Sequence, residues 1–469
     1  MNTERIQREF QMDPSVPQRQ RALHLVQNLK QQFPELTQEF SSLFSYYEQD
    51  ESICLIGLGC EADIRADLKD NTLSLSLTIN EEEAITVHAS LESQCFHRYE
   101  KIFEHTHRFI QQVKPILEAS LGHKASTIPF LGGWKCVTGQ SDTESLIRFT
   151  LPKLMITLSS QSCCVSGTKS LVEPITTAML TENLNSAMAL YTRPEFKHYR
   201  ATPTCREYID NLVNTMEKME QNCHKVVLGR KKELQYEQPI NPLQLLHQIQ
   251  KLDKKTYDIY MDWPEVGAWI GVSPETLVVK EGQYVRVEPL AGTRKGSDHQ
   301  AQAEKYKREL IDSEKENIEH ETASDLFFKA LSDTCEPGSV IEKESKSILD
   351  LGYVQHLKSC IQGTTRPETS IFHILAKIYP PATIWGLPIR QSEALIENFE
   401  PFQREFFTGA FGFFNLEDAA HFSLAIRVAK IHGEQASVFA GSGIVQGADP
   451  YHEWMETDNK MAPFIKPSL

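Results

Sequence analysis

The chain has 469 residues, of which 40% are hydrophobic and 24% charged. These proportions are near the average for globular proteins and argue against disordered, fibrous and coiled-coil classes. The formal net charge of -15 argues against nucleic acid as a partner, because proteins that bind it neutralise phosphates with lysine and arginine. The length allows two or three ordinary domains or one large fold.

Cysteine usage and the lack of long apolar segments indicate the compartment. The ten cysteines form no CxxC pair and no zinc-type spacing, which fits a reducing cytosol. No run approaches the ~20 apolar residues of a membrane span, and the first residues lack the apolar core of a signal peptide. We therefore expect a cytoplasmic protein with no membrane partner.

The first portion of the chain, residues 1–203, is predicted to be rich in strands. Leucines at helical spacing predict a helix over 18–48, and ICLIGLG at 53–59 is typical of a buried strand. Alternation in TLSLSLTI at 72–79 and the run at 148–160 predict further strands. No chemistry-bearing residues cluster in this portion.

The second portion, residues 204–463, is predicted to mix helices and strands. Amphipathic spacing predicts helices over 206–222, over about 300–330 and near the end of the chain. Strands are predicted at 224–234, 268–282, 283–293, 406–415, 421–433 and 436–445. With no internal repeat and no low-complexity linker, we expect one continuous α+β body.

Two pairs of glutamates, each spaced three residues apart, lie in the second portion. Glu316 and Glu319 occur in SEKENIEHE, and Glu453 and Glu456 occur in DPYHEWMETDNK. Residues three apart share one face of a helix. Four carboxylates brought together would repel one another unless a cation lay between them, and ligands with oxygen alone favour Mg²⁺. A single pair in isolation is more often a solvated helix face, so both interpretations stay open here.

Three other stretches carry acid–base or anion-binding candidates. Lys225 lies in the apolar strand KVVL, where a desolvated lysine can act as a general base, although most lysines at strand edges face water. Glu275 in GVSPETL is either a shielded general acid or a turn residue that caps. In FAGSGIVQG the third glycine comes too late for a dinucleotide fingerprint. Gly441 and Gly443 there indicate either an anion-binding backbone or a plain tight turn.

Nine segments, in this order, resemble the chorismate-utilising enzymes, which include isochorismate, salicylate, anthranilate and aminodeoxychorismate synthases. They are KVVLGR, GVSPETL, PLAGTRKG, SEKENIEHE, PPATIWGLP, FFTGAFGFF, FSLAIR, AGSGIV and DPYHEWMETDNK. The resemblance covers 204–463, with FLGGWK at 130–135 as a further family-like turn in a variable N-terminal portion. It implies an anthranilate synthase-like α+β fold with central stacked β-sheets, helices outside and an active-site cleft between the layers.

The resemblance also implies a metal cofactor and a substrate. Glu319 and Glu456 match the direct ligands of Mg²⁺, and Glu316 and Glu453 match outer positions that reach the ion through water. The ion would hold the ring carboxylate of chorismate, so that an acidic protein can bind a dianion.

The substrate contacts follow by resemblance as well. Arg427 in LAIR would bind the enolpyruvyl carboxylate, as suits a bidentate guanidinium. Backbone amides around Gly441 and Gly443, with Lys460, would meet the ring carboxylate. Gly292 and Thr293 in LAGT would line the pocket.

Three positions depart from the common family pattern. Thr383 in PPATIWGLP aligns with a threonine of the enzymes that use ammonia, where those that use water usually have alanine. Tyr379 stands where many relatives carry histidine. Phe407 replaces a frequent tyrosine that bonds the enolpyruvyl carboxylate.

Lys225 indicates which branch of the family the chain resembles. By this resemblance, enzymes that use water have lysine at this position, and those that use ammonia typically have glutamine. By resemblance, Lys225 deprotonates a water that attacks ring carbon C2, and Glu275 protonates the hydroxyl that leaves C4. The expected activity is a Mg²⁺-dependent isochorismate synthase, an isomerase, acting in menaquinone biosynthesis because the long N-terminal portion resembles that subgroup.

Three alternatives stay open. A salicylate synthase would form isochorismate and then eliminate pyruvate. An anthranilate or aminodeoxychorismate synthase component is favoured by Thr383 and opposed by Lys225, and we expect no glutaminase partner unless that alternative holds. A silent relative that binds a chorismate-like ligand is suggested by Tyr379 and Phe407, and opposed by the retained base, acid and glutamates.

Overall fold

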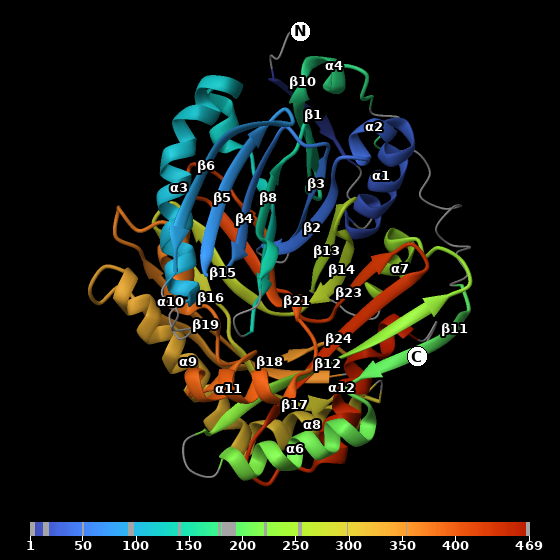
Figure 1. Ribbon diagram of the computed structural model, residues 1–469, viewed down its shortest axis with the longest axis vertical. Coiled ribbons are helices and arrows are strands. Elements are labelled where there is room, and N and C mark those ends of the chain that lie inside the picture. Colours follow the sequence, from blue (N-terminus) through green and yellow to red (C-terminus); the bar gives the residue numbers. More distant parts are fainter. Residues whose placement is uncertain are drawn as a thin grey trace.

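The computed structural model describes residues 5–465 except 13–17, 49–50, 92–97, 139–141, 177–179, 181–193, 220–222, 252–255, 298 and 353. Its strands form two large antiparallel sheets, and helices lie around the outside (Figure 1). The predicted α+β class with central stacked sheets is therefore confirmed.

The first sheet has 12 strands among the described residues. In spatial order they are β1 (Arg5–Gln11), β10 (Ser162–Thr168), β9 (Leu154–Leu158), β3 (Glu51–Leu58), β2 (Ser41–Glu48), β13 (Tyr257–Trp263), β14 (Gly267–Ser273), β23 (Val428–His432), β24 (Gln435–Ile444), β12 (Lys225–Tyr236) and β11 (Phe196–Thr202), with β20 (Gly386–Leu387) also on β12.

The second sheet also has 12 strands within the described ranges. Its order is β17 (Leu290–Lys295), β19 (Val354–Thr364), β16 (Tyr284–Val287), β15 (Thr276–Glu281), β22 (Ala420–Leu424), β21 (Glu405–Phe414), β7 (Phe130–Cys136), β8 (Thr143–Leu151), β4 (Ala62–Lys69), β5 (Thr72–Ile79) and β6 (Glu82–Ser90), with β18 (Ile341–Asp350) also on β19.

The helices cover the outer faces of these sheets (Figure 1). They are α1 (Gln18–Gln32), α2 (Pro34–Thr37), α3 (Arg98–Leu121), the 3-10 helix η2 (His123–Thr127), α4 (Lys169–Val172), α6 (Cys205–Met219), α7 (Pro242–Ile249), α8 (Gln300–Ile311), α9 (Glu314–Thr334), α10 (Ile371–Ile378), α11 (Ile389–Phe399) and α12 (Pro450–Ile465). None of these described helices is long and apolar enough to cross a membrane.

Strand β13 lies between two apolar cores, one between the two sheets and one under helices α1 and α7. Its side chains alternate between the two faces of the sheet, as the pleat requires. Ile259, Met261 and Trp263 belong to the core between the sheets, whereas Tyr260 belongs to the core under α1 and α7. Asp258 and Asp262 share the face of Tyr260 and pair with Arg19 and Lys30 of α1.

Most predicted elements of the second portion are confirmed, with adjusted boundaries. The segment expected as one helix over about 300–330 is two helices, because Ser313 caps a new one and its side chain accepts a hydrogen bond from the Glu316 backbone N–H. The strands expected over 268–282, 283–293 and 421–433 are each two strands, namely β14 and β15, β16 and β17, and β22 and β23. Pro274 and Glu275 form the break between β14 and β15.

Two predictions for the first portion are wrong. The helix expected over 18–48 ends at Gln32, because Pro34 cannot continue the hydrogen-bond ladder of α1. Residues 41–48 instead form β2, which pairs with β3 and β13. The segment FLGGWK, expected as a turn, lies in strand β7.

The two portions of the chain share both sheets. Strand β2 from the first portion pairs with β13 from the second, and β7 pairs with β21. The boundary expected at 203/204 falls between β11 and α6. The N-terminal strands therefore extend the same two sheets that carry the chemistry-bearing residues.

Gly133 in β7 lets the two portions approach each other closely. A Cβ atom at this position would lie 1.9 Å from the carbonyl oxygen of Ala410 in β21. We predict that Gly133→Ala lowers the free energy of unfolding by about 3 kcal/mol, because the strands must separate to admit a methyl group. Urea denaturation measures this loss. Gly338→Asn, at an open turn with φ +77°, is the control and should change stability by less than about 1 kcal/mol, and equal effects would contradict the prediction.

Candidate functional site

The predicted site residues come from both sheets and from two helices. Strands β12 and β24 of the first sheet supply Lys225, Gly441 and Gly443, and β17 of the second supplies Gly292 and Thr293. Helices α9 and α12 carry the glutamate pairs. The contacts below bring most of these residues to one region where the two sheets meet.

Lys225 begins strand β12 and reaches helix α9. Its Nζ atom lies 2.5 Å from Oε1 of Glu319, and its side chain is mostly buried. A Cβ atom on Gly443 would lie 2.8 Å from Cε of Lys225. A side chain at position 443 would therefore displace the lysine, which gives this glycine a steric role beside the candidate base.

Glu275 lies in the bend between β14 and β15 and is almost fully buried. Burial raises the pKa of its carboxyl group to about 7, against a hydrogen bond from Thr383 and the charges of Lys225 and Arg427. The Thr383 hydroxyl donates to Oε1 of Glu275 over 3.0 Å. Burial thus favours the protonated form of this carboxyl group, which is the state that a general acid needs.

Glu316 is held by strand β17 beside the pocket-lining candidates. Arg294 Nη1 lies 2.7 Å from Oε1 of Glu316, and the Thr293 backbone N–H donates to Oε2 over 3.2 Å. Gly292 has φ +78°, and a Cβ atom there would lie 3.2 Å from Cβ of Glu316. Glycine is therefore needed at this position both for the backbone angle and for space.

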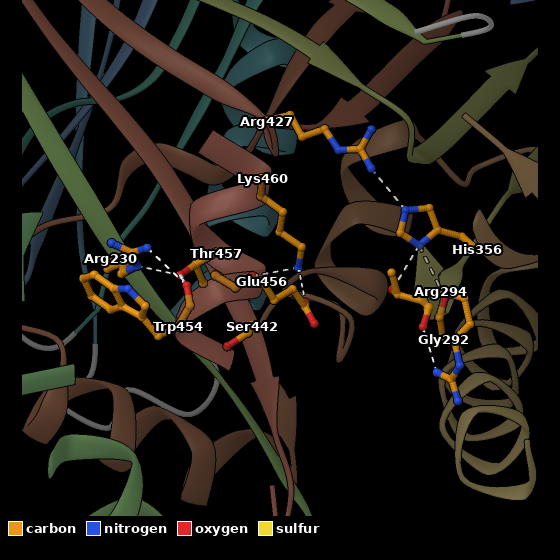
Figure 2. A network of polar contacts seen from close by, with 12 residues as sticks. Arg230, Gly292, Arg294, His356, Arg427, Ser442, Trp454, Glu456, Thr457 and Lys460 are labelled. Carbon is orange, nitrogen blue, oxygen red and sulfur yellow. Dashed lines mark hydrogen bonds and ion pairs between the residues drawn. The ribbon is translucent and has the colours of Figure 1, made fainter. Parts of the chain in front are cut away.

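Lys460 on α12 links the second glutamate pair to strand β24. Its Nζ atom lies 2.7 Å from Oε1 of Glu456 and donates to the Gly441 carbonyl oxygen over 2.9 Å (Figure 2). Burial opposes ionisation of Glu456, but Lys460 and then Lys225 outweigh it and hold the pKa of this carboxyl below its usual value. Lys225 thus acts electrostatically on glutamates from both helices.

Gly441 and Gly443 lie within strand β24 and not in a turn. They pair with Gly229 and Val227 of β12, and the chain turns only at Gly447, where φ is +79°. The tight-turn interpretation is therefore wrong for this pair. Their approach to a ligand anion stays a prediction.

Arg427 and His356 form a polar contact that the sequence did not indicate. Nη2 of Arg427 lies 3.1 Å from Nε2 of His356 in β19 (Figure 2). Burial, with the charges of Arg427 and Lys460, lowers the pKa of His356 to about 3, so the ring is neutral at physiological pH. Because arginine donates to Nε2, the ring proton belongs on Nδ1, which faces the Gly292 carbonyl oxygen at 3.3 Å.

Arg427 itself has a backbone conformation that is rare for a side chain of its size. Its φ is 53°, in the left-handed region, and the residue is buried. Such conformations cost free energy and cluster at ligand-binding sites. The contact with His356 orients the guanidinium that is predicted to bind a carboxylate.

The departures Tyr379 and Phe407 are accommodated in the core between the sheets. The Tyr379 hydroxyl donates to the Thr408 carbonyl oxygen over 2.9 Å, and its ring packs edge-on against Trp134. Phe407 stacks on Phe439 with 5.6 Å between ring centroids. Both side chains therefore fill core positions, whereas Thr383 contacts the candidate acid directly.

Comparison with known proteins identifies the family. A sequence profile of chorismate binding enzymes matches residues 43–466. The chain belongs to this family. The isochorismate synthase MenF of Bacillus subtilis (strain 168) is 26% identical over 437 residues, which cover 90% of this chain and 87% of that protein.

Two other chorismate binding enzymes are also similar to this chain, one compared by sequence and one by structure. Component 1 of anthranilate synthase from Saccharolobus solfataricus is 32% identical over 221 residues, 47% of this chain and 52% of that protein. The structure of MenF from Escherichia coli, described as the menaquinone-specific isochorismate synthase, has a TM-score of 0.73 at 19% identity and covers 99% of this chain and 95% of that chain. The family fold is thus present over the whole body.

The carboxylate groups of the four predicted metal-binding glutamates are of the chemical type that binds a hard cation. Among the described residues, no three His, Cys, Asp or Glu side chains stand together as a formed metal site. Glu319, Glu316 and Glu456 are each paired with lysine or arginine instead. Carboxylate oxygens without nitrogen or sulfur ligands are the set that Mg²⁺ prefers, and a bound ion would replace the basic partners as counter-charge. Glu453 lies in the first turn of α12, three residues before Glu456.

The raised pKa of Glu275 predicts a dependence of stability on pH. The folded carboxyl has a pKa of about 7 against 4.5 for an ordinary glutamate. Its stabilising contribution is therefore fully present below about pH 4.5 and is lost as the pH rises through about 7. We predict that between about pH 5 and about pH 8 the wild-type protein loses about 2 kcal/mol of unfolding free energy relative to Glu275→Gln.

Urea denaturation of both proteins across this pH range tests the prediction. The glutamine variant is the matched control, because it keeps the shape and the contact with Thr383 without an ionisable group. Parallel pH curves for the two proteins would show that Glu275 titrates as an ordinary exposed carboxyl.

Proposed function

We propose that the protein is an isochorismate synthase that isomerises chorismate with Mg²⁺ as its cofactor. The observation that carries this proposal is that Lys225 and Glu275 lie in one site, close enough for the charge of Lys225 to act on the Glu275 carboxyl. The lysine is mostly buried, and the carboxyl has its pKa raised to about 7 by burial. A buried carboxyl that favours its protonated form is typical of a general acid. The two MenF enzymes among the relatives support the choice.

In the proposed reaction Lys225 and Glu275 each move one proton. Lys225, in its neutral amine form, takes a proton from a water molecule as the water oxygen bonds to C2 of the ring. Both ring double bonds shift, from C1=C2 and C5=C6 to C1=C6 and C4=C5, and the C4–O bond breaks, while Glu275 gives its proton to the departing hydroxyl group. One water enters and one leaves, so chorismate and isochorismate are isomers.

The carboxylate groups of the substrate need positive partners within an acidic protein. We assign the enolpyruvyl carboxylate to Arg427, and the ring carboxylate to Lys460 and the backbone of Gly441 and Gly443. The neutral His356 supports this assignment, because it orients the Arg427 guanidinium without adding a second charge. When bound, Mg²⁺ supplies further positive charge for the ring carboxylate. Four glutamates would hold it: Glu319 and Glu456 directly, and Glu316 and Glu453 through water.

Menaquinone biosynthesis in the cytoplasm is the setting that we propose. The relatives named MenF support the pathway. All nine described cysteines are free thiols, which is the usual state in a reducing compartment. The proposed use of water removes the need for a glutaminase partner.

A second activity is favoured by one contact in the site. The Thr383 hydroxyl bonds the carboxyl of the candidate acid at 3.0 Å, and threonine at this position is the pattern of the enzymes that use ammonia. An aminating synthase, or a salicylate synthase that also eliminates pyruvate, is therefore the alternative to be tested against isochorismate synthase.

Product analysis tests the proposal. The purified protein is incubated with chorismate and Mg²⁺, first without and then with ammonium, while products are separated with mass detection and pyruvate is assayed. We predict isochorismate without pyruvate in both conditions. Salicylate with pyruvate, an aminated product that requires ammonium, or no product at all would each overturn it.

Two variants test the assigned roles. We predict that Lys225→Ala lowers kcat at least about 100-fold, because proton transfer by a positioned base contributes that much, while chorismate still binds. Glu319→Ala should lose both activity and the response to Mg²⁺. Steady-state kinetics over a range of Mg²⁺ concentrations measure both. Lys231→Ala is the control, since Lys231 lies on the same strand but pairs with Glu233; wild-type turnover in Lys225→Ala would remove this lysine from the mechanism.

A further inference from the structure

Arg230 is a fully buried arginine in β12, five residues after Lys225. It belongs to the motif KVVLGR, but none of the roles assigned above uses it. Burial of a guanidinium is costly unless other groups replace its water, and burial lowers the pKa of this one to about 10. The groups that replace water here come largely from one element, the helix α12.

The guanidinium of Arg230 makes four contacts with α12. Those with Trp454 and Thr457 can be followed in Figure 2. Its Nε atom donates to the Thr457 hydroxyl over 2.5 Å, and Nη2 donates to the Trp454 carbonyl oxygen over 3.2 Å. Nη2 also pairs with the Asp458 carboxylate. The Trp454 ring lies under the guanidinium, 3.5 Å from its central carbon to the ring centroid. A planar cation with several fixed donors can make all of these contacts at once, and lysine cannot.

These contacts hold the half of α12 that carries the glutamates. The buried apolar side chains of the helix, Met461, Pro463 and Phe464, all lie in its last turns. Glu453 and Glu456 precede them, on the part of the helix that Arg230 contacts. Trp454 lies between these two glutamates in sequence, and Thr457 directly follows the second.

A single strand therefore carries both the candidate base and the anchor of the second glutamate pair. Lys225 contacts Glu319 of α9 at one end of this segment of β12, and Arg230 contacts α12 five residues along. The strand also pairs with β24, whose Gly441 accepts a hydrogen bond from Lys460 of α12. Both helices therefore contact side chains of the same strand.

We infer that Arg230 is the positioning residue for the metal-binding carboxylates of α12, so that its contacts with Trp454, Thr457 and Asp458 set the affinity of the site for Mg²⁺. This inference rests on the proposed function for the identity of the ion. Residues that orient metal ligands typically change metal affinity by about 10-fold to about 100-fold when they are replaced.

Calorimetric titration of Mg²⁺ into the purified variants tests the inference. We expect Arg230→Lys to weaken Mg²⁺ binding at least about tenfold, with kcat recovering at saturating Mg²⁺. Hydrogen exchange should speed up in α12, residues 450–465, more than elsewhere. Thr457→Val should weaken binding in the same direction, because it removes the acceptor of the Nε–H group, while Thr457→Ser keeps that hydroxyl and should retain the affinity.

Arg148→Lys is the matched control for a buried arginine. Arg148 in β8 also pairs with a carboxylate, Asp63, and lies over a tryptophan, Trp263, at 5.2 Å. Its strand pairs with β4 and β7, which carry no candidate site residue. This variant should lose stability and keep the wild-type affinity for Mg²⁺.

The outcomes separate this inference from the proposed function. Wild-type affinity in Arg230→Lys, or an equal loss in Arg148→Lys, would overturn the role of Arg230 while isochorismate formation stands. Mg²⁺ binding that depends on Arg230, in a protein that makes another product, would support the inference and overturn the proposed function. A wild-type protein that binds no Mg²⁺ would overturn both the metal assignment and the inference.

Discussion

The ion pair between Lys225 and Glu319 is the contact on which the rest of the site depends. It joins side chains 94 residues apart, from a strand of the first sheet and a helix beside the second, at 2.5 Å. Both charges are largely withdrawn from water, so neither is stable there without the other or a replacement cation. Lys225 also lowers the pKa of Glu456. One lysine thus lies within electrostatic reach of glutamates from both helices, and it is the residue that we propose as the base.

Much of this arrangement could be predicted from the sequence, because it depends on local spacing. Glutamates three apart share a helix face, and the period of apolar residues indicated most strands of the second portion. The failures have physical reasons. The helix expected over 18–48 stops because Pro34 lacks an N–H group, and residues 41–48 become a strand because β3 and β13 supply partners from elsewhere in the chain. Pairing of this kind leaves no local signal.

The contacts that orient the site could not be read from the sequence. His356 lies 71 residues from Arg427, and Arg230 lies more than 220 from Thr457 and Asp458. Tertiary packing brings these residues together: β19 lies beside the segment before β23, and α12 lies against β12. One sequence signal could have indicated a site role for His356, namely that it is a polar residue on a half-buried strand. The departures at Tyr379 and Phe407 were likewise interpretable only once their places in the core were known.

The central claim is that a water molecule, activated at Lys225, adds to the ring of chorismate. Incubation of the protein with chorismate and Mg²⁺ in water enriched in oxygen-18, followed by mass detection of the product, tests this claim most directly. The account predicts isochorismate that carries one solvent oxygen, at C2, and incorporation of label at least about 100-fold slower in the Lys225→Ala reaction. Unlabelled isochorismate, or a labelled product from Lys225→Ala at the wild-type rate, would contradict it.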